Sequence, residues 1–304
     1  MSEVDVTIGG QQMRLSNLDK VLYPSVGFTK GQVIDYYVRI GETVLPHVRD
    51  RPMTMARYPN GVTGEMFYQK RCPDHRPEFV RLTRVWSETT KRNLSYCVID
   101  DVPSIIYLVN LAALELHPFL AHSDDIYTPT YMTFDLDPGP GATLVDCSRV
   151  AVQLRDLLRQ AGLECFPKSS GKKGMHLSVP LNTPCSYDDT KGFSRALAML
   201  LEKYHPEQVT SNMRKDLRTG KVFVDWSQND EHKSTVCVYS LRVFERPTVS
   251  TPLLWEEVEG AVKTGKPESL VFETEQVLER VQRLGDLYEP VLTMKQKLPS
   301  LVPA

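Results

Sequence analysis

The chain has 304 residues, of which 41% are hydrophobic and 24% are charged, and its formal net charge is -2. This composition is typical of a soluble globular protein with one large domain or two modest ones, and no apolar run approaches the roughly 20 residues of a membrane-spanning helix. The small net charge gives no support by itself for nucleic-acid binding, and the N-terminus lacks the basic start and apolar stretch of a signal peptide.

Segments with helical or strand periodicity follow one another along the first part of the chain. Thr29 is a typical N-cap residue, so it predicts the start of a helix. The expected elements are a strand pair over 4–15, a helix from Thr29 to about residue 47, strands over 51–70, two strands over 81–101 around a polar loop at 88–93, and a helix over 104–116.

The second part of the chain continues this irregular alternation, without the repeated strand-helix-strand rhythm of a doubly wound fold. We therefore expect an α+β fold, with mixed sheets and helices on their outer faces. The expected elements are a strand over 130–137, a helix over 146–161, a loop over 168–174, a strand over 175–180, a helix over 186–204 that opens with a capping box, strands over 221–226 and 236–242, helices over 254–264 and 273–284, and a loose tail from 289.

The six cysteines are scattered along the chain. None forms a Cys-x-x-Cys pair or lies beside a histidine at zinc spacing, which disfavours both a disulfide framework and a zinc site. We therefore expect reduced thiols in a cytoplasmic protein at Cys72, Cys97, Cys147, Cys165, Cys185 and Cys237.

Two carboxylates end the strand predicted over 130–137. Side chains alternate along a strand, so Asp135 and Asp137 project to one face while their neighbours pack on the other. The two charges repel each other unless a cation such as Mg²⁺ or Mn²⁺ lies between them. A solvated acidic turn explains an isolated Asp-x-Asp about equally well. Asp225 ends another apolar strand, and it would either cap a turn or complete a site for two divalent ions.

Several other residues could bind phosphate. In the loop over 169–176, glycines let backbone N–H groups approach an anion while serine and lysine supply a donor and a charge. The loop lacks the Walker A spacing, so a basic turn is the alternative. Arg242 in the strand predicted over 236–242 could clamp a phosphate. His117, after an apolar helix, is more typical of a helix C-cap.

Taken together, these segments resemble the polymerase domain of bacterial ATP-dependent DNA ligase D, in the archaeo-eukaryotic primase superfamily. The matching stretches occur in the family's order, at 15–24, 28–37, 57–61, 67–70, 114–118, 134–139, 170–176, 217–229 and 239–242. The resemblance implies one primase-polymerase domain over 1–304, either stand-alone or excised from a longer protein. Its parts would be a DNA- and 5′-phosphate-binding part (1–95), a catalytic palm (96–250), and C-terminal helices with a tail (251–304).

The resemblance also implies roles for individual residues. Asp135, Asp137 and Asp225 match the catalytic metal ligands of a two-metal site for Mn²⁺ or Mg²⁺. Ala56 stands where many members carry a lysine, so one phosphate contact is expected to be lost. The positions that match nucleotide-binding residues are Arg57, His117, Ser170, Lys173, His176, Arg218, Gln228 and Arg242. Those that match residues contacting DNA or a downstream 5′-phosphate are Asn17, Lys20, Lys30, Phe67 and Tyr68.

The function implied by the resemblance is a template-dependent DNA/RNA polymerase that prefers ribonucleotides and fills gaps and extends ends in bacterial non-homologous end joining. Its expected partners are gapped or broken DNA, NTPs or dNTPs, Ku and a separate ATP-dependent DNA ligase, with no membrane, in the cytoplasm near the nucleoid. The alternatives are a non-catalytic end-bridging module of the same fold and a primase-like enzyme that starts chains de novo. A Mn²⁺-dependent glycosyltransferase would explain Asp135 and Asp137 but not Asp225 or the lysines near residues 20–30.

Overall fold

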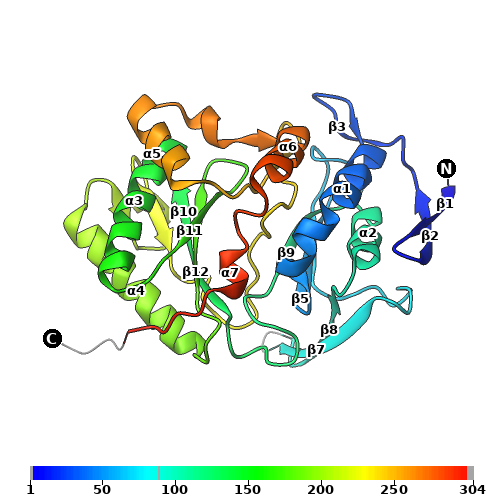
Figure 1. Cartoon of the computed structure of the whole chain (residues 1–304), viewed down its shortest axis with the longest axis horizontal. Helices are drawn as coiled ribbons and strands as arrows, with labels where there is room; N and C mark the ends of the chain where they lie inside the picture. Colours follow the sequence, from blue (N-terminus) through cyan, green and yellow to red (C-terminus); the bar gives the residue numbers. More distant parts are fainter. Residues whose placement is uncertain (1–2, 88–89, 300–304) are drawn as a thin grey trace. The chain divides into compact units, whose positions relative to one another are not determined.

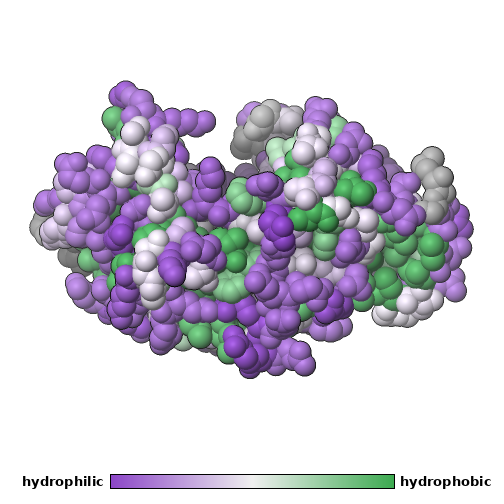
Figure 2. Space-filling view, turned by 90° about the horizontal axis from the view of Figure 1, so that it is seen from above, coloured by the Kyte–Doolittle hydropathy of each residue, from purple (hydrophilic) through white to green (hydrophobic). Residues whose placement is uncertain are grey.

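Figure 1 shows the computed structural model of the chain, which describes residues 3–87 and 90–299. Helices alternate with mainly antiparallel sheets, which confirms the predicted α+β class. The polar loop predicted over 88–93 falls partly on residues 88 and 89, which lie outside the described residues. None of the helices in the described part of the chain is both long and apolar enough to cross a membrane. The face seen in Figure 2 is mostly hydrophilic, with hydrophobic groups scattered among the polar ones.

Two compact units make up the chain, and they interleave along the sequence. The first unit runs to residue 126 and also takes in 234–250 and 273–285, whereas the second comprises 127–233, 251–272 and the segment from 286. The single domain with three parts that the family resemblance implied stays a prediction.

The first unit is built around β5, which is hydrogen-bonded to β6, β8 and β9, while β8 also pairs with β7. Helix α1 begins at the predicted cap, since the Thr29 side chain accepts from the backbone N–H of Gln32. The elements of this unit are β1 (Glu3–Ile8), β2 (Gln11–Ser16), β3 (Val21–Tyr23), β4 (Phe28–Thr29), α1 (Lys30–Val48), β5 (Pro52–Arg57), β6 (Phe67–Gln69), β7 (Arg81–Ser87), β8 (Arg92–Val98), α2 (Val102–Asn110), β9 (Ala113–Pro118), β15 (Thr248–Val249) and α6 (Thr274–Leu284), with β16 (Phe272–Glu273) where the chain enters it for the last time.

The helix predicted over 104–116 is wrong in its second half. Helix α2 ends at Asn110, Ala112 takes a left-handed φ of 61°, and the chain continues as strand β9 paired with β5. Apolar, buried residues occur both before and after Ala112, at 105–109 and at 113, 114 and 116, so periodicity alone cannot separate a buried helix from a buried strand there. The strand predicted over 236–242 is also wrong, because this segment turns at Tyr239 and makes only an isolated bridge from Leu241 to Val249.

The prediction of six reduced cysteines is wrong for two of them. Cys72 and Cys97 form a disulfide with a Cα–Cα distance of 5.0 Å, whereas the other four cysteines are free thiols. The pairing follows from the fold, because the backbone N–H of Cys72 donates to the carbonyl of Ser95 at 2.8 Å and so holds the segment after β6 against β8. The two cysteines are 25 residues apart in the sequence, so their spacing alone does not predict that they pair.

Replacing Cys72 and Cys97 together with serine is expected to lower the free energy of unfolding by roughly 3 kcal/mol, since a cross-link over a loop of this length restricts the unfolded chain by about that amount. Urea denaturation under non-oxidising, thiol-free conditions measures the loss, and a thiol reductant should produce the same loss in the wild type. The matched control is Cys185→Ser, a half-buried free thiol. An unchanged denaturation midpoint in the double variant would contradict this role of the disulfide.

The second unit contains a five-stranded sheet in the order β11-β12-β10-β14-β13, with β10 at its centre. Figure 1 shows α3, α4 and α5 together on one side of the sheet. The elements are β10 (Tyr131–Pro138), α3 (Leu144–Gln160), β11 (Phe166–Ser169), β12 (Met175–Pro180), α4 (Tyr187–Tyr204), β13 (Val209–Thr210), β14 (Val222–Asp225), α5 (Trp255–Thr264) and α7 (Pro290–Thr293), with 3₁₀ turns at Lys215–Leu217 and Pro267–Leu270.

The core of the second unit fixes which face of β10 is covered. Met132, Phe134 and Leu136 are fully buried in one cluster with apolar residues of α3, α4 and α5. Because strand side chains alternate, Asp135 and Asp137 project from the opposite face of the sheet. Helices α3, α4 and α5 therefore lie on the face opposite the carboxylates.

Two expectations for this unit are corrected. Residues 166–169 form the edge strand β11, so a strand takes the first two residues of the loop predicted over 168–174; proline at 167 is compatible with this, because edge strands tolerate it. The tail from 289 is not loose up to residue 299. Its Gln296 side chain donates to the carbonyls of Glu164 at 3.0 Å and Pro180 at 2.8 Å, so the tail is bonded along the sheet edge.

Candidate active site

Three carboxylates lie at the ends of the two central strands. In the antiparallel register of β10 and β14, Asp135 faces Asp225, and Asp137 lies two residues further along the same face. Asp135 and Asp225 are half-buried, and Asp137 is exposed. The turn after β10 depends on Gly139, since a Cβ there would lie 1.8 Å from the carbonyl oxygen of Arg218. This close approach holds β10 and β14 in the register that sets the carboxylates side by side.

Neighbouring groups already contact two of these carboxylates. His176, opposite Asp135 in the register of β12, places Nε2 3.3 Å from Asp135 Oδ1. Asp225 accepts from the backbone N–H of Ser227 at 2.8 Å and from Gln228 Nε2 at 3.1 Å. His176, predicted as a nucleotide-binding residue, thus lies against the first carboxylate, and Gln228 lies against the third.

Arg218 packs beside the strand that ends in Asp225. Its guanidinium carbon lies 3.6 Å from the ring centroid of Phe223, and its Nη2 donates to the carbonyl of Met213 at 2.8 Å. Its backbone carbonyl borders Gly139. Arg218 therefore packs where the turn after β10 meets the start of β14, over the ring of the residue that faces Asp137 in the register.

The carboxylate face suits a hard divalent cation in its chemistry. Like charges placed opposite each other on neighbouring strands repel, and oxygen ligands are those that Mg²⁺ and Mn²⁺ prefer. Burial, followed by the charges of Asp137, Asp135 and Asp146, raises the pKa of the nearby Cys147 thiol well above its usual value. Within residues 3–87 and 90–299, no three His, Cys, Asp or Glu side chains already converge as a metal-ligand set. The three carboxylates are oxygen ligands of the type that such an ion prefers, and they lie near one another on the sheet. To bind one ion together, their side chains would have to rotate toward it.

The loop between β11 and β12 is a closed turn beside β10. The Ser170 hydroxyl accepts from the backbone N–H groups of Gly174 at 3.1 Å and Lys172 at 3.3 Å. Gly174 must be glycine, because a Cβ there would lie 2.6 Å from the carbonyl oxygen of Leu136. Lys173 is exposed. The predicted phosphate-binding residues Ser170, Lys173 and His176 therefore lie in one turn and strand that borders the carboxylates.

In the first unit, His117 and Arg242 meet at a buried carboxylate that sequence reasoning missed. Glu115 accepts from the backbone N–H of Val243 at 2.9 Å, with Arg242 Nε 3.3 Å from its Oε1 and His117 Nε2 3.0 Å from its Oε2. His117 is not a helix C-cap, as the sequence favoured, but a residue of β9. On a strand, the spacing Glu-x-His puts both side chains on one face. Because this segment was predicted to be a helix, where residues two apart do not share a face, the pairing was missed.

Arg57 and the two adjacent aromatic residues lie on β5 and β6 of the same sheet. Arg57 faces Phe67 in the register, and its Nε donates to the carbonyl of Leu111 at 2.7 Å. Burial lowers the pKa of Arg57. Phe67 and Tyr68 are both 47% exposed, so neither is a core residue, and Tyr68 also packs edge-on against His117 at 5.7 Å between ring centroids.

The predicted 5′-phosphate residues lie together at the start of α1. The backbone N–H of Lys20 donates to the carbonyl of Asn17 at 3.0 Å, and that of Lys30 donates to the carbonyl of Lys20 at 2.8 Å. Lys20 Nζ reaches Asn60 Oδ1 at 3.1 Å. Lys30 is only 4% exposed, and its Nζ donates to the Ser16 carbonyl at 2.6 Å and to Asn110 Oδ1 at 2.8 Å. Burial, then the charges of Lys20 and Arg57, lower the pKa of Lys30 to about 8.

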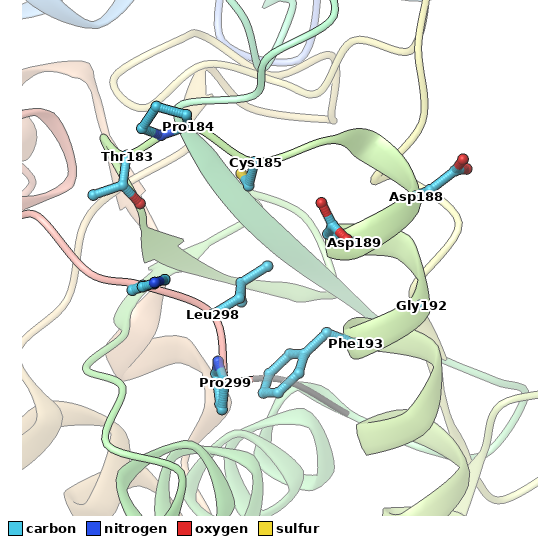
Figure 3. Close-up of a pocket in the computed structure, with 10 residues that line it drawn as sticks. Thr183, Pro184, Cys185, Asp188, Asp189, Gly192, Phe193, Leu298 and Pro299 are labelled. Atoms are coloured by element: carbon cyan, nitrogen blue, oxygen red, sulfur yellow. The ribbon is translucent and has the colours of Figure 1, made fainter. Parts of the chain in front are cut away.

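A pocket of about 480 Å³ lies elsewhere in the second unit, where the tail passes the start of α4. Figure 3 shows Leu298 and Pro299 of the tail facing Phe193 of α4. The site residues predicted from the sequence are not among its lining residues. The predicted catalytic and nucleotide-binding residues of this unit therefore favour the carboxylate face, and not this pocket, as the candidate active site.

Known proteins are similar to this chain over most of its length. The family model of the LigD primase-polymerase domain matches residues 29–288. The multifunctional non-homologous end joining protein LigD of Mycolicibacterium smegmatis is 38% identical over 283 residues, which cover 92% of this chain and 36% of that protein. The bifunctional non-homologous end joining protein LigD of Bacillus subtilis is 30% identical over 276 residues, covering 90% of this chain and 43% of that protein.

Among solved structures, the polymerase domain from Mycobacterium tuberculosis ligase D in complex with DNA superimposes with a TM-score of 0.86 at 36% sequence identity. The match covers 94% of this chain and 100% of the solved chain. The chain therefore spans roughly two-fifths or less of the length of these curated relatives, while it matches the solved polymerase domain from end to end.

Proposed function

The chain belongs to the family of LigD primase-polymerase domains, and from this we propose that it is a template-dependent polymerase that adds nucleotides to the 3′ end of DNA. Its substrates would be gaps and broken ends in bacterial non-homologous end joining, with ribonucleotides preferred over deoxyribonucleotides. The observation that carries the proposal is the register of β10 and β14, which sets Asp135 opposite Asp225 and Asp137 beside them on the face of the sheet opposite α3, α4 and α5.

Asp135, Asp137 and Asp225 would hold the divalent ions, with Mn²⁺ or Mg²⁺ as candidates. When bound, such ions neutralise phosphate charge and stabilise the attacking and leaving oxygens of an in-line displacement. The chain's own part is to hold the three carboxylates together at the ends of the two central strands. The contacts of Gln228 and Ser227 with Asp225 support this, because they fix one of the three donors.

The turn after β11 would bind the triphosphate. The exposed Lys173 supplies a cation, and the hydrogen bond between the Gly174 N–H and the Ser170 hydroxyl keeps the turn that carries it tight. His176 lies between this turn and Asp135, so it would orient the phosphates against the first carboxylate. Arg218 would add charge on the side of Asp225.

The residues of the first unit would bind the rest of the substrate. Arg57, His117 and Arg242 are polar positions for the nucleotide, and the buried Glu115 fixes the last two. Phe67 and Tyr68 offer half-exposed rings for stacking on bases, and Asn17, Lys20 and Lys30 would recognise a downstream 5′-phosphate. Ku and a separate ATP-dependent ligase are the proposed protein partners.

Recognition of the 5′-phosphate is expected to weaken at alkaline pH. Lys30 carries a charge below its pKa of about 8 and loses it above, whereas a terminal phosphate stays doubly ionised from pH 7 upward. The ratio of affinities for gapped DNA with and without the 5′-phosphate should therefore fall about tenfold between pH 7 and pH 9. Fluorescence anisotropy at constant ionic strength measures the ratio.

The control for this prediction is Lys30→Met, which should show a small ratio that does not change with pH. The 5′-hydroxyl duplex controls for changes elsewhere on the protein, because it lacks the group that Lys30 would bind. A wild-type ratio that is equal at pH 7 and pH 9 would exclude Lys30 as the titrating contact.

Primer extension on a gapped duplex tests the proposed activity against its alternatives. A polymerase adds the nucleotide complementary to the template, and it uses rNTPs better than dNTPs if the proposed preference holds. An end-bridging module would bind the same DNA without incorporation, and a primase-like enzyme would make products without a primer. Incorporation of nucleotides regardless of the template base would contradict templated synthesis.

A further inference from the structure

A buried lysine that none of the roles above uses lies behind His176. Lys168 on β11 is only 3% exposed, and it faces His176 in the antiparallel register with β12. Its Nζ lies 3.2 Å from His176 Nδ1. On the other side of the imidazole ring, Nε2 lies 3.3 Å from Asp135 Oδ1. Lys168, His176 and Asp135 thus form a continuous polar chain across three adjacent strands.

The chemistry of the lysine head group fixes the direction of this chain. A lysine ammonium has three donors and no acceptor, so the Nδ1 atom that it contacts must be the acceptor. The imidazole proton then resides on Nε2, the nitrogen that faces Asp135. In the other tautomer an N–H donor would face the lysine ammonium and a lone pair would face the Asp135 carboxylate, so both contacts would be unfavourable.

The backbone around Lys168 keeps its side chain in place. Ser169 donates from its backbone N–H to the Thr251 carbonyl at 2.8 Å, and Leu253 donates to the Pro167 carbonyl at 3.0 Å. Lys168 itself bridges to Pro252. The edge strand is thereby covered by residues 251–253, and the lysine cannot leave without opening both pairings.

We propose that Lys168 is a positioning residue that holds His176 with its Nε2 proton directed at Asp135. The inference rests on the proposed function, in which Asp135 is a metal ligand and His176 lies next to the triphosphate. A partner on the far nitrogen of a histidine fixes its ring orientation and tautomer, and around metal sites the loss of such an outer partner typically costs roughly 10–100-fold in metal affinity or activity. Lys168 would act only through His176, without touching the substrate.

The first test reads the tautomer directly and needs no activity. Two-dimensional ¹H–¹⁵N spectra of ¹⁵N-histidine-labelled protein distinguish protonated from unprotonated ring nitrogens, and His176 is identified among the seven histidines by its absence in His176→Gln. We expect an Nε2-protonated ring in the wild type and a mixture of tautomers in Lys168→Met. An unchanged His176 spectrum in Lys168→Met would overturn the proposal, whether or not the protein proves to be a polymerase.

The second test is a double-mutant cycle on primer extension. Lys168→Met should lower kcat roughly 10–100-fold, and it should have no further effect in a His176→Ala background. Equal losses in both backgrounds, or a loss confined to the KM for the nucleotide, would show that Lys168 acts on the substrate directly. Lys203→Met, on the exposed face of α4, is the matched control and should leave kcat unchanged.

A milder variant guards against misfolding. Lys168→Arg keeps a side chain that donates and cannot accept, so it should retain the Nε2-protonated tautomer and more of the activity than Lys168→Met. If Lys168→Arg is folded, by circular dichroism and thermal midpoint, and still shows mixed tautomers, the donor role assigned to Lys168 is wrong.

Discussion

Replacing Asp135 with asparagine is expected to lower nucleotide incorporation by roughly 10³-fold while leaving the protein folded. The substitution keeps the shape of the side chain but removes the charge that would hold a divalent ion, and a thousandfold loss corresponds to about 4 kcal/mol of transition-state stabilisation. Stability should not suffer, because Asp135 faces Asp225 on the neighbouring strand and the change removes a repulsion between like charges. Single-nucleotide extension under saturating rNTP, together with the thermal midpoint, measures both effects.

The matched control for this variant is Asp188→Asn, an exposed carboxylate in the first turn of α4 of the same unit. It should extend the primer like the wild type. If Asp135→Asn stays within about threefold of the wild type, corresponding to less than about 1 kcal/mol, Asp135 is not a metal ligand. An equal loss in Asp188→Asn would point instead to a general effect of negative charge.

The second large effect is on stability and concerns Glu115. The side chains of Glu115 and Arg242 are only 7% and 12% exposed, so Glu115→Ala would leave a guanidinium buried beside an empty acceptor site. Breaking a buried ion pair from one side typically costs about 3–5 kcal/mol. Glu115→Gln should lose less, because its amide oxygen can still accept from the backbone N–H of Val243. Urea denaturation followed by circular dichroism gives the free energies.

An exposed ion pair provides the comparison. Glu275 is paired with Arg39 at 2.7 Å, but the two side chains are 67% and 44% exposed. Solvent screens such pairs, so Glu275→Ala should leave the denaturation midpoint unchanged. A Glu115→Ala variant as stable as Glu275→Ala would mean that Arg242 finds another partner and that Glu115 does not hold the nucleotide-binding residues in place.

The parts of this structure that were predictable from the sequence are those set by local rules. The alternation of a strand was enough to put Asp135 and Asp137 on one face, and hydroxyl or carboxylate spacing was enough to place the N-caps at Thr29 and Ser186. These features depend on residues within one turn or one strand of each other. Strand alternation and N-capping can therefore be predicted from the local sequence alone, without any tertiary contact.

The parts that were not predictable depend on residues far apart in the chain. The Cys72–Cys97 disulfide, the Glu115–Arg242 pair and the Lys168–His176 contact each need a tertiary alignment that no spacing reveals. Strand β9 was mistaken for helix because a buried apolar run satisfies both periods. The assignment of Asp225 to the same site as Asp135 came from the family resemblance, and the register of β10 and β14 supplies its physical basis.

The central claim is that the carboxylate face of β10 and β14 supports metal-dependent, templated nucleotide addition. The most direct measurement is extension of a gapped duplex by the purified wild-type chain, with each rNTP supplied singly, in Mn²⁺ and in excess EDTA. We predict addition of the nucleotide complementary to the template base in Mn²⁺ and none in EDTA. Intact DNA binding without incorporation in Mn²⁺, or incorporation that persists in EDTA, would contradict the claim.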